Sequence, residues 1–403
     1  MNEGTMARIL LKNVDVITLD RANEVLRGAD VAIEGKTIAH LGQVPETWVA
    51  DEGLDLADHL VMPGFWNAHT HASMTLTRSI GDDLPLERWF NDRIWVAESG
   101  LTEEDVYWGA MLAAAEMIRG GTVGFADHYF HQHRVAEVAE QAGLKALLAT
   151  TLFGAGDELT LEDGIEEALH YHGAADGRIR TALGPHSPYI CPSEFLQDVA
   201  IAAQREGLMI HIHLAESEAQ VAVSREKYGK SPVEHLRDLG VFESPVLAAH
   251  CIAVSESDLD IFAEKGVIPV QCPQCHMKLG MGVTPVPAML ARGIPVAVGT
   301  DGPGSNNNLA MLEEAQNAAL IQKLHLRDAT VLAGDLPLRL ATTHGARALG
   351  FADSGILRVG AAADLIVLDC RKPHLRPRHS LVGNVLYAAH SGDVSHVMVD
   401  GRW

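Results

Sequence analysis

From residue 60 to residue 301 the chain alternates between short apolar runs and longer amphipathic stretches. Eight of the apolar runs have the length of a buried strand, and the stretches between them repeat apolar positions with a helical period. The predicted strands cover 61–68, 122–127, 146–153, 179–184, 208–214, 246–251, 267–272 and 294–301. Strand–helix alternation predicts a parallel sheet, and eight repeats predict that it closes into a (β/α)8 TIM barrel. The alternative, an open doubly wound sheet, lacks a glycine-rich dinucleotide motif after the first strand.

The two ends of the chain show a different pattern, in which short strands are separated by turn signals. Residues 8–57 and 359–402 carry this pattern, which predicts a small composite β-sandwich built from both termini. We therefore expect 1–58 to form the first part of the sandwich, 59–356 a metal-dependent barrel, and 357–403 the second part of the sandwich.

Composition narrows the possible partners. The chain has 31 basic and 53 acidic residues, a formal charge of −22, which disfavours nucleic acid and anionic membrane surfaces. It has no secretory signal and no apolar run long enough to span a membrane, and its five cysteines are too few for a disulfide framework. We expect a cytoplasmic homo-oligomer that acts on a small-molecule substrate and has no nucleic-acid or membrane partner.

Histidines and carboxylates recur where the predicted strands end. His69 and His71 lie one residue apart after the first run, so on a strand they would face the same side. The later strands end near further polar residues, namely His186, His211, His213, Glu216, His250 and Asp301. Chemistry in this barrel collects at the carboxyl ends of the strands, so the pattern predicts a metal site.

Three histidines and an aspartate leave one position on a divalent ion for water, whose pKa the ion lowers from about 15.7 toward 7. His213 is the better ligand from the fifth strand because it lies nearer the carboxyl end, and His211 is expected to pack behind it.

The segment CPQCH, residues 272–276, matches the C-x-x-C-H motif of c-type haem attachment. Attachment of that kind requires export, for which the sequence has no signal. The segment also follows the apolar run VIPVQ, so we interpret it as part of the barrel.

Several motifs resemble the amidohydrolase superfamily and, within it, the methylthioadenosine/S-adenosylhomocysteine deaminases. They include PGFWNAHTHASMTLTRS, GPHSPY, HIHLAES, AAHC and GTDGPGSNNNLAMLEE. The resemblance implies that four residues bind the metal, namely His69, His71, His213 and Asp301. It also implies that Glu216 is the proton shuttle and His250 the histidine beside the reacting water. RTALGPHSPY contains no lysine to bridge two metals, which favours one ion, zinc or alternatively iron.

The resemblance also implies two substrate contacts, Glu98 to ribose hydroxyls and His186 to the substrate. His276 replaces an asparagine that is usual in the family, so we expect it at the barrel mouth as a third substrate contact or as a space-filling side chain. Trp89 and Phe90 either cap the substrate or belong to the core.

The predicted reaction is hydrolytic deamination of an adenosine-type nucleoside, with methylthioadenosine, adenosine and S-adenosylhomocysteine as candidates. Asp301 would accept a proton from water, Glu216 would relay protons to the ring nitrogen and the departing amine, and His250 would hydrogen-bond the attacking oxygen.

Another heterocycle, such as guanine, 8-oxoguanine, a pterin or an s-triazine, is an alternative substrate for the same catalytic residues. A further alternative is a barrel without enzymatic activity. Such a protein would be expected to have lost its metal-binding residues, whereas all four are present in this sequence.

The region after the third strand bears on the 5′-substituent. Residues 135–177 contain no arginine, and their one lysine, Lys145, begins that strand. The segment carries acidic residues instead, at Asp157, Glu158, Glu162, Asp163, Glu166 and Glu167. We therefore expect it to disfavour the carboxylate tail of S-adenosylhomocysteine, unless Arg78 or Arg93 binds that tail.

Overall fold

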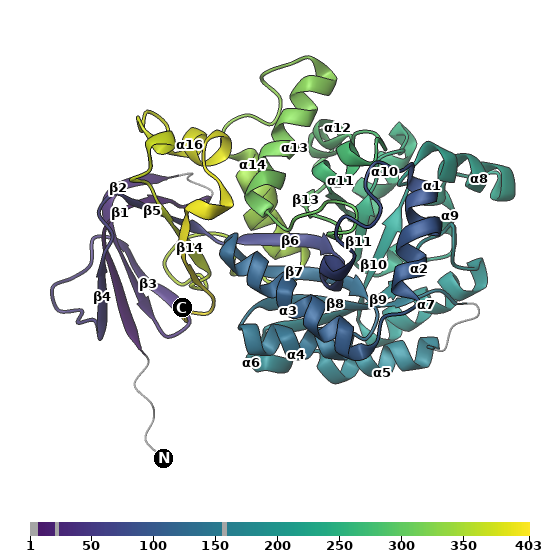
Figure 1. Cartoon of the computed structure of the whole chain (residues 1–403), viewed down its shortest axis with the longest axis horizontal. Helices are drawn as coiled ribbons and strands as arrows, with labels where there is room; N and C mark the ends of the chain where they lie inside the picture. The colour runs from purple at the N-terminus through teal and green to yellow at the C-terminus, as the bar shows by residue number, and fades with distance from the viewer. Residues whose placement is uncertain (1–6, 21–23, 155–158) are drawn as a thin grey trace.

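The computed structural model describes residues 7–20, 24–154 and 159–403, and its central element is a parallel sheet of eight strands (Figure 1). Each strand pairs with the next along the chain. The strands are β6 (Phe65–Thr70), β7 (Thr122–Tyr129), β8 (Lys145–Leu152), β9 (Ile179–Pro185), β10 (Met209–Leu214), β11 (Val246–His250), β12 (Ile268–Gln271) and β13 (Ala297–Val298). The predicted eight-stranded barrel architecture is therefore confirmed.

The barrel closes where the segment after β13 meets β6. The Asp301 N–H donates to the His69 carbonyl over 3.0 Å, and the Thr300 N–H donates to the Asn67 side chain over 2.9 Å. A Cβ at Gly299 would lie 2.6 Å from the backbone of His69, so only glycine allows this approach. This closure brings Asp301 next to the histidines of β6.

Helices follow the barrel strands and cover the outside of the sheet (Figure 1). The longer ones are α3 (Glu103–Arg119), α4 (Gln132–Ala142), α5 (Leu161–Tyr171), α7 (Ser193–Glu206), α8 (Glu218–Tyr228), α10 (Glu256–Lys265) and α13 (Met311–Leu326). The shorter ones are α6 (Ala174–Gly177), α9 (Pro232–Asp238), α11 (Pro273–Lys278), α12 (Val286–Ala291), α14 (Leu336–Arg339), α15 (Gly345–Ala348) and α16 (Leu381–Tyr387). Capping boxes fix where α3 and α10 begin, through Thr102 and Ser255.

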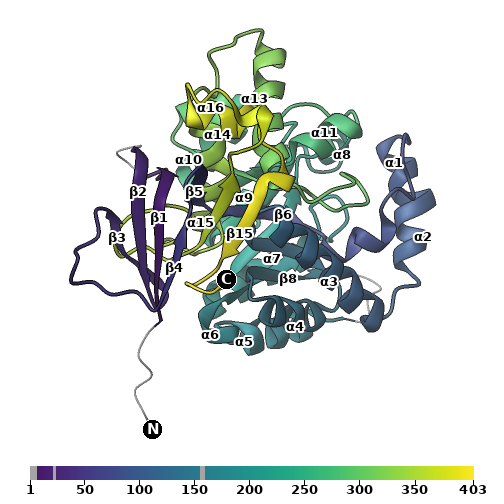
Figure 2. The same cartoon turned by 60° about the vertical axis from the view of Figure 1, so that its left-hand side comes forward.

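Two short helices, α1 (Leu86–Trp89) and α2 (Trp95–Glu98), lie at the edge of the barrel and are joined by a π-helical turn over 90–94 (Figure 2). They carry the aromatic side chains of the segment between β6 and α3. Among the residues that the structure describes, no helix combines the length and apolar composition needed to cross a membrane.

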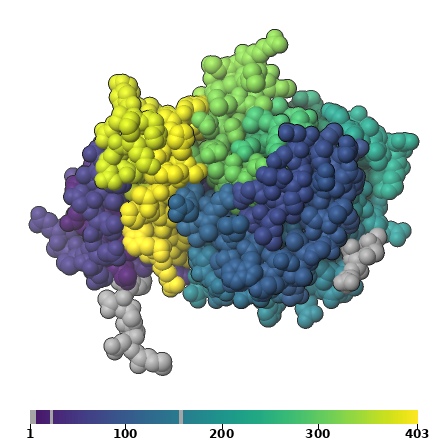
Figure 3. All heavy atoms as spheres, viewed as in Figure 1, coloured from purple at the N-terminus to yellow at the C-terminus, as the bar shows by residue number. Residues whose placement is uncertain are grey.

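Both termini contribute to a second sheet, as predicted. Its seven strands are β1 (Arg8–Ile17), β2 (Val25–Glu34), β3 (Thr37–Gly42), β4 (Glu52–Asp55), β5 (His59–Pro63), β14 (Leu365–Asp369) and β15 (Val394–Met398). They form one mixed sheet in the order β15-β14-β5-β1-β2-β3, with β4 paired to β1. The C-terminal segment lies between the N-terminal strands and the barrel in the space-filling view (Figure 3).

Most predicted strand bounds agree with the structure to within two residues, and two predicted strands differ more than that. The predicted strand 61–68 is two strands, because β5 ends at Pro63 in the small sheet and β6 begins at Phe65 in the barrel. A Cβ at Gly64, between them, would lie 2.2 Å from Val123, so only glycine fits at this junction. The predicted strand 294–301 shortens to Ala297–Val298. The predicted domain boundaries, between residues 58 and 59 and between residues 356 and 357, stay predictions.

Candidate metal centre and active site

The first two predicted ligands converge at the carboxyl end of β6. His69 is within the strand, whereas His71 directly follows it, and their ring centroids lie 4.9 Å apart. Asp301 approaches both, because its Oδ1 lies 3.5 Å from Nε2 of His69 and 3.2 Å from Nε2 of His71. One ligand atom from each of these residues lies within 4.8 Å of the other two. The barrel closure therefore brings together three of the four predicted metal ligands.

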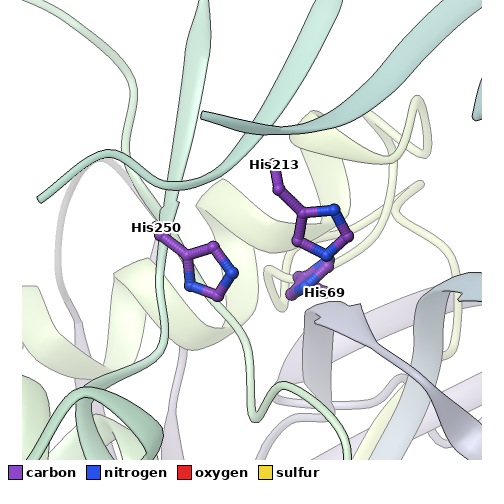
Figure 4. A group of neighbouring side chains, drawn as sticks. All are labelled: His69, His213 and His250. Atoms are coloured by element: carbon purple, nitrogen blue, oxygen red, sulfur yellow. The ribbon is translucent and has the colours of Figure 1, made fainter. Parts of the chain in front are cut away.

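His213 and His250 reach the same point from β10 and β11 (Figure 4). The Nε2 of His213 lies 3.4 Å from the Nε2 of His71, and the His213 and His250 rings stack with centroids 5.4 Å apart. His250 has a left-handed backbone, with φ of 75°, which is costly for a residue with a Cβ. The register of β10 against β11 pairs His250 with Leu214, the residue after His213, and so brings His213 and His250 close together.

Two of the histidines are oriented by hydrogen bonds from Nδ1, the ring nitrogen that does not face the cluster. The Nδ1–H of His71 donates to the His128 carbonyl over 2.5 Å, and the Nδ1–H of His213 donates to the His186 carbonyl over 2.8 Å. A proton on Nδ1 leaves the Nε2 lone pair free in the neutral ring. His211 pairs with Nδ1 of His69 over 2.9 Å, which is the supporting position expected for it.

Electrostatics at this point favour a bound cation. Burial, with the neighbouring imidazoles, keeps the pKa of His69 well below its usual range, and the same causes lower that of His213 to about 4. Burial also opposes charge on His71, but the hydrogen bond and charge of Asp301 outweigh it and raise the pKa of His71 to about 9. In the metal-free protein the proton on His71 therefore offsets the negative charge of Asp301. A bound divalent ion would take over this role from the proton.

The donor set fits a divalent metal ion. The Nε2 of His69 is buried and has no hydrogen-bond partner among the described residues, although it points at Asp301. A buried ring nitrogen without a partner is costly unless a ligand binds it. Neutral imidazoles combined with a carboxylate are the ligands that zinc prefers, with one position left for water. The predicted set of His69, His71, His213 and Asp301 could therefore hold such an ion.

Glu216 lies beside this cluster. Its Oε2 accepts hydrogen bonds from Tyr189 over 2.7 Å and from Gln220 over 3.2 Å, and its Oε1 lies 3.8 Å from Nε2 of His250. Burial would raise the pKa of this carboxyl, but the nearby His250 and His213 and the two hydrogen bonds lower it below its usual value. Glu216 is therefore ionised at neutral pH in the metal-free protein.

A cavity of about 430 Å³ opens above the cluster, a volume suited to a small ligand of nucleoside size. The residues that line it include the polar His71, His213, Glu216 and Asp301. Trp89 and Phe90 also line it, although Trp89 is buried in a hydrophobic cluster against which Phe90 packs, so the choice between a capping role and a core role stays open. The described residues that line it include no lysine or arginine. The cavity therefore offers aromatic and acidic contacts but, among the described residues, no lysine or arginine for an anionic ligand.

Two predicted substrate contacts line the cavity and one does not. Glu98 accepts a hydrogen bond from Tyr129 over 2.7 Å, and His186 stacks on Phe153 with ring centroids 5.3 Å apart. His276 is 3% exposed and lies behind His250, with 3.2 Å between its Nε2 and Nδ1 of His250. The predicted substrate contact at His276 is therefore corrected: α11 turns the side chain away from the cavity.

Sequence reasoning missed three residues of the site. His128 and Tyr129 line the cavity at the end of β7, and Tyr189 holds Glu216. The predicted second strand ended at 127, which left His128 and Tyr129 in a loop. The search for polar residues at strand ends would have found both if that strand had been extended by two residues. Tyr189 lies within the GPHSPY motif but was given no role.

Comparison with known proteins gives a consistent result. The model of the amidohydrolase family matches residues 60–403. A 5-methylthioadenosine/S-adenosylhomocysteine deaminase of Pelotomaculum thermopropionicum is 44% identical over 98% of this chain and 93% of the relative. The crystal structure of a zinc-bound adenosine deaminase from Xanthomonas campestris superposes with a TM-score of 0.93, at 33% identity over 98% of this chain and 92% of that one.

A zinc complex of atrazine chlorohydrolase from Arthrobacter aurescens has a TM-score of 0.90 at 23% identity, over 98% of this chain and 94% of that one, and shares the fold. The family model, the full-length relatives and the strand-end cluster of histidines and aspartate agree. This chain belongs to the amidohydrolase family.

Proposed function

We propose that this protein is a metal-dependent hydrolytic deaminase of adenosine-type nucleosides, with 5′-methylthioadenosine and adenosine as its substrates. The observation that carries the proposal is the position of Glu216, an oriented carboxylate between the four-ligand cluster and a nucleoside-sized cavity. The full-length relatives named as methylthioadenosine/S-adenosylhomocysteine deaminases, and the adenosine deaminase with the same fold, support this substrate class.

The metal is one divalent ion held by His69, His71, His213 and Asp301. Zinc is our choice because the ligand set suits it and because the similar adenosine deaminase binds zinc, with iron as the alternative. When bound, such an ion acts as a Lewis acid and makes water a nucleophile at neutral pH. The end of β9 has no lysine that could bridge a second ion there, which supports a single catalytic metal.

The side chains around the cluster supply proton transfer. Deamination replaces the amino group with the oxygen of water: the oxygen stays on the ring carbon, one hydrogen of the water leaves with the amino group as ammonia, and the other remains on the ring nitrogen. Asp301 accepts a proton from the attacking water. Glu216 is ionised at rest, so it must collect a proton during the cycle before it protonates the ring nitrogen and then the departing amine. His250, 3.8 Å from Glu216, hydrogen-bonds the attacking oxygen.

Two residues position the substrate in this proposal. Glu98 accepts from Tyr129 through Oε1, and its remaining acceptor sites suit the two hydroxyls of a ribose. Burial raises the pKa of Glu98, so a hydrogen-bonding diol would also stabilise its charged form. His186, stacked on Phe153, lies on the cavity wall within reach of a bound base.

The alternative is an aminohydrolase of another heterocycle, such as guanine, 8-oxoguanine, a pterin or an s-triazine. Ultraviolet absorbance, followed with zinc-loaded protein and a panel of purine nucleosides, free bases and triazines, distinguishes the two. We expect turnover of methylthioadenosine and adenosine to exceed that of every free base. Faster turnover of a base or a triazine would replace our proposal with the alternative.

We also propose that the protein is a cytoplasmic homo-oligomer. Trp108 and Leu112 lie one turn apart on α3 and are 57% and 51% exposed, an apolar pair that a second subunit could cover. Light scattering coupled to size-exclusion chromatography measures the mass, and a monomeric mass would refute the proposal.

A further inference from the structure

A second group of metal-binding side chains lies behind the catalytic cluster. Helix α11 begins directly after β12, with Cys272 as its N-cap and His276 four residues later. The His276 N–H donates to the Cys272 carbonyl over 2.9 Å, so this turn is helical and brings both side chains to one face. A cysteine and a histidine at this spacing can bind the same ion.

His250 completes the group from β11. Its Nδ1 lies 3.2 Å from Nε2 of His276, and one ligand atom from each of His250, Cys272 and His276 lies within 4.8 Å of the other two. All three side chains are at most 3% exposed. The 3.2 Å between the two ring nitrogens is close to the edge of a tetrahedral site, in which ligands bind at about 2.0–2.3 Å from the ion.

The thiol of Cys272 differs from the other thiols of the chain. Four cysteines donate to an oxygen, namely Cys191, Cys251, Cys275 and Cys370. Cys272 is fully buried and has no such acceptor within the described residues. This sulfur is therefore placed to bind a cation rather than to donate to a protein oxygen.

We propose that Cys272, His276 and His250 form a second metal site, separate from the catalytic ligands, that takes one borderline-soft divalent ion such as Zn²⁺ or Cd²⁺. A thiolate with two neutral imidazoles is a ligand set that these ions prefer. On binding, the Cys272 thiol loses its proton to solvent and a sulfur–metal bond forms. His250 binds through Nδ1, while its Nε2 still faces Glu216.

Occupation of this site has a consequence for the neighbouring centre. An ion on Nδ1 of His250 fixes the protonation state and the orientation of a ring that lies between the two sites. We therefore expect excess zinc to inhibit the enzyme by acting on His250, without displacement of the ion held by His69, His71, His213 and Asp301.

Metal counting tests the site without reference to any activity. The full-length protein is loaded with Zn²⁺ or with Co²⁺, dialysed and analysed for metal, and the cobalt form is examined for thiolate-to-metal charge-transfer absorption. We expect two ions per chain and a thiolate band. Cys272→Ser should bind one ion and lack the band, with second-site affinity lowered more than about 100-fold, because even groups behind a ligand contribute 10–100-fold.

Two further variants make the result decisive. Cys370→Ser removes another buried thiol, outside this group, and should keep both ions and the band. His276→Asn should lose the second ion as Cys272→Ser does, and it serves as the test if the cysteine variant does not fold. Two ions in both site variants would show adventitious binding elsewhere, and one ion in the parent protein would show a hydrogen-bonded cluster only. Either result overturns the proposal, and neither bears on deamination.

Discussion

Tyr189 and Gln220 donate hydrogen bonds to the same oxygen of Glu216, over 2.7 and 3.2 Å, and leave the other oxygen facing His250. A carboxylate held in this way presents one oxygen to the cavity in a fixed direction. The arrangement gives a proton relay its geometry before any substrate binds.

The first prediction concerns Glu216. Glu216→Gln keeps the shape of the side chain but cannot carry a proton, so we expect normal metal content and a loss of about 10²–10⁴-fold in kcat. Metal analysis and an ultraviolet deamination assay check both parts. Glu218→Gln, at an exposed position outside the cavity, is the matched control and should retain activity. A Glu216→Gln enzyme within tenfold of the parent would exclude Glu216 as the relay.

The second prediction concerns the hydroxyl of Tyr189. Its hydrogen bond helps to lower the pKa of Glu216, so Tyr189→Phe should raise that pKa. If the ionised form of Glu216 begins the cycle, the acid limb of kcat/KM moves to higher pH. A charge-assisted hydrogen bond contributes roughly 1.5–3 kcal/mol, which corresponds to a shift of about one to two pH units. An unchanged acid limb would contradict this role of Tyr189.

The third prediction concerns the metal ligands. Asp301→Ala and His213→Ala each remove one of the proposed ligands, so metal content and activity should fall together in each variant. Metal content is measured after dialysis, and circular dichroism confirms that the variant is folded. An active Asp301→Ala protein with a full complement of metal would rule out the site as we have drawn it.

The fourth prediction concerns Glu314, a fully buried residue of α13 that accepts from Asn306 and from the Gln274 N–H. Burial outweighs these bonds and raises its pKa from 4.5 to about 8. Between those pH values the folded protein holds a proton that the unfolded chain has released. The free energy of unfolding should therefore fall as pH rises from 5 to 8, by an amount of the order of 4 kcal/mol.

Glu314→Gln keeps a neutral side chain of the same shape, so this part of the pH dependence should disappear in the variant. Denaturant unfolding at several pH values measures it. Glu226→Gln, at an exposed position of α8 that does not contribute to the pKa of Glu314, should keep the parental slope. Equal slopes in the parent and Glu314→Gln would show that Glu314 does not retain the proton.

Sequence periodicity was sufficient for the barrel because each strand is buried and each following helix is amphipathic. It failed at the two ends of the sheet. Residues 61–68 form one apolar run, yet β5 and β6 pair with different sheets, and a local pattern does not record the partner of a strand. At the other end, β13 stops at Val298, and Asp301 hydrogen-bonds the backbone of His69 outside a regular ladder, which a local pattern of apolar residues does not reveal.

The candidate site followed from one rule, that polar residues at strand ends meet. The rule placed His69, His71, His213 and Asp301 close together, because parallel strands share one carboxyl end. It could not place His276, which also follows a strand. There Pro273 starts a helix at once, and the helix turns the side chain behind the barrel lining. The direction of a chain after a strand depends on packing that the sequence pattern does not contain.

The region that would meet a 5′-substituent is acidic in the structure. A second cavity shares Glu98, Phe130 and Phe153 with the first, and Glu103, Asp163 and Glu167 are among its other lining residues. Asp157 and Glu158 lie outside the described residues. Arg78 forms an ion pair with Glu116, and neither Arg78 nor Arg93 is among the residues lining either cavity.

The last prediction is that uncharged 5′-groups are preferred over the tail of S-adenosylhomocysteine. The relatives are named for both thioethers, so the family alone does not decide between them. A carboxylate of this kind is best bound by a lysine or an arginine, and the described residues that line the two cavities include neither. A missing charge-assisted hydrogen bond costs roughly 1.5–3 kcal/mol, so kcat/KM for methylthioadenosine should be higher by at least about tenfold. Adenosine, which has no tail, is the control. Equal kcat/KM for the two thioethers would mean that a cationic side chain reaches the tail after all.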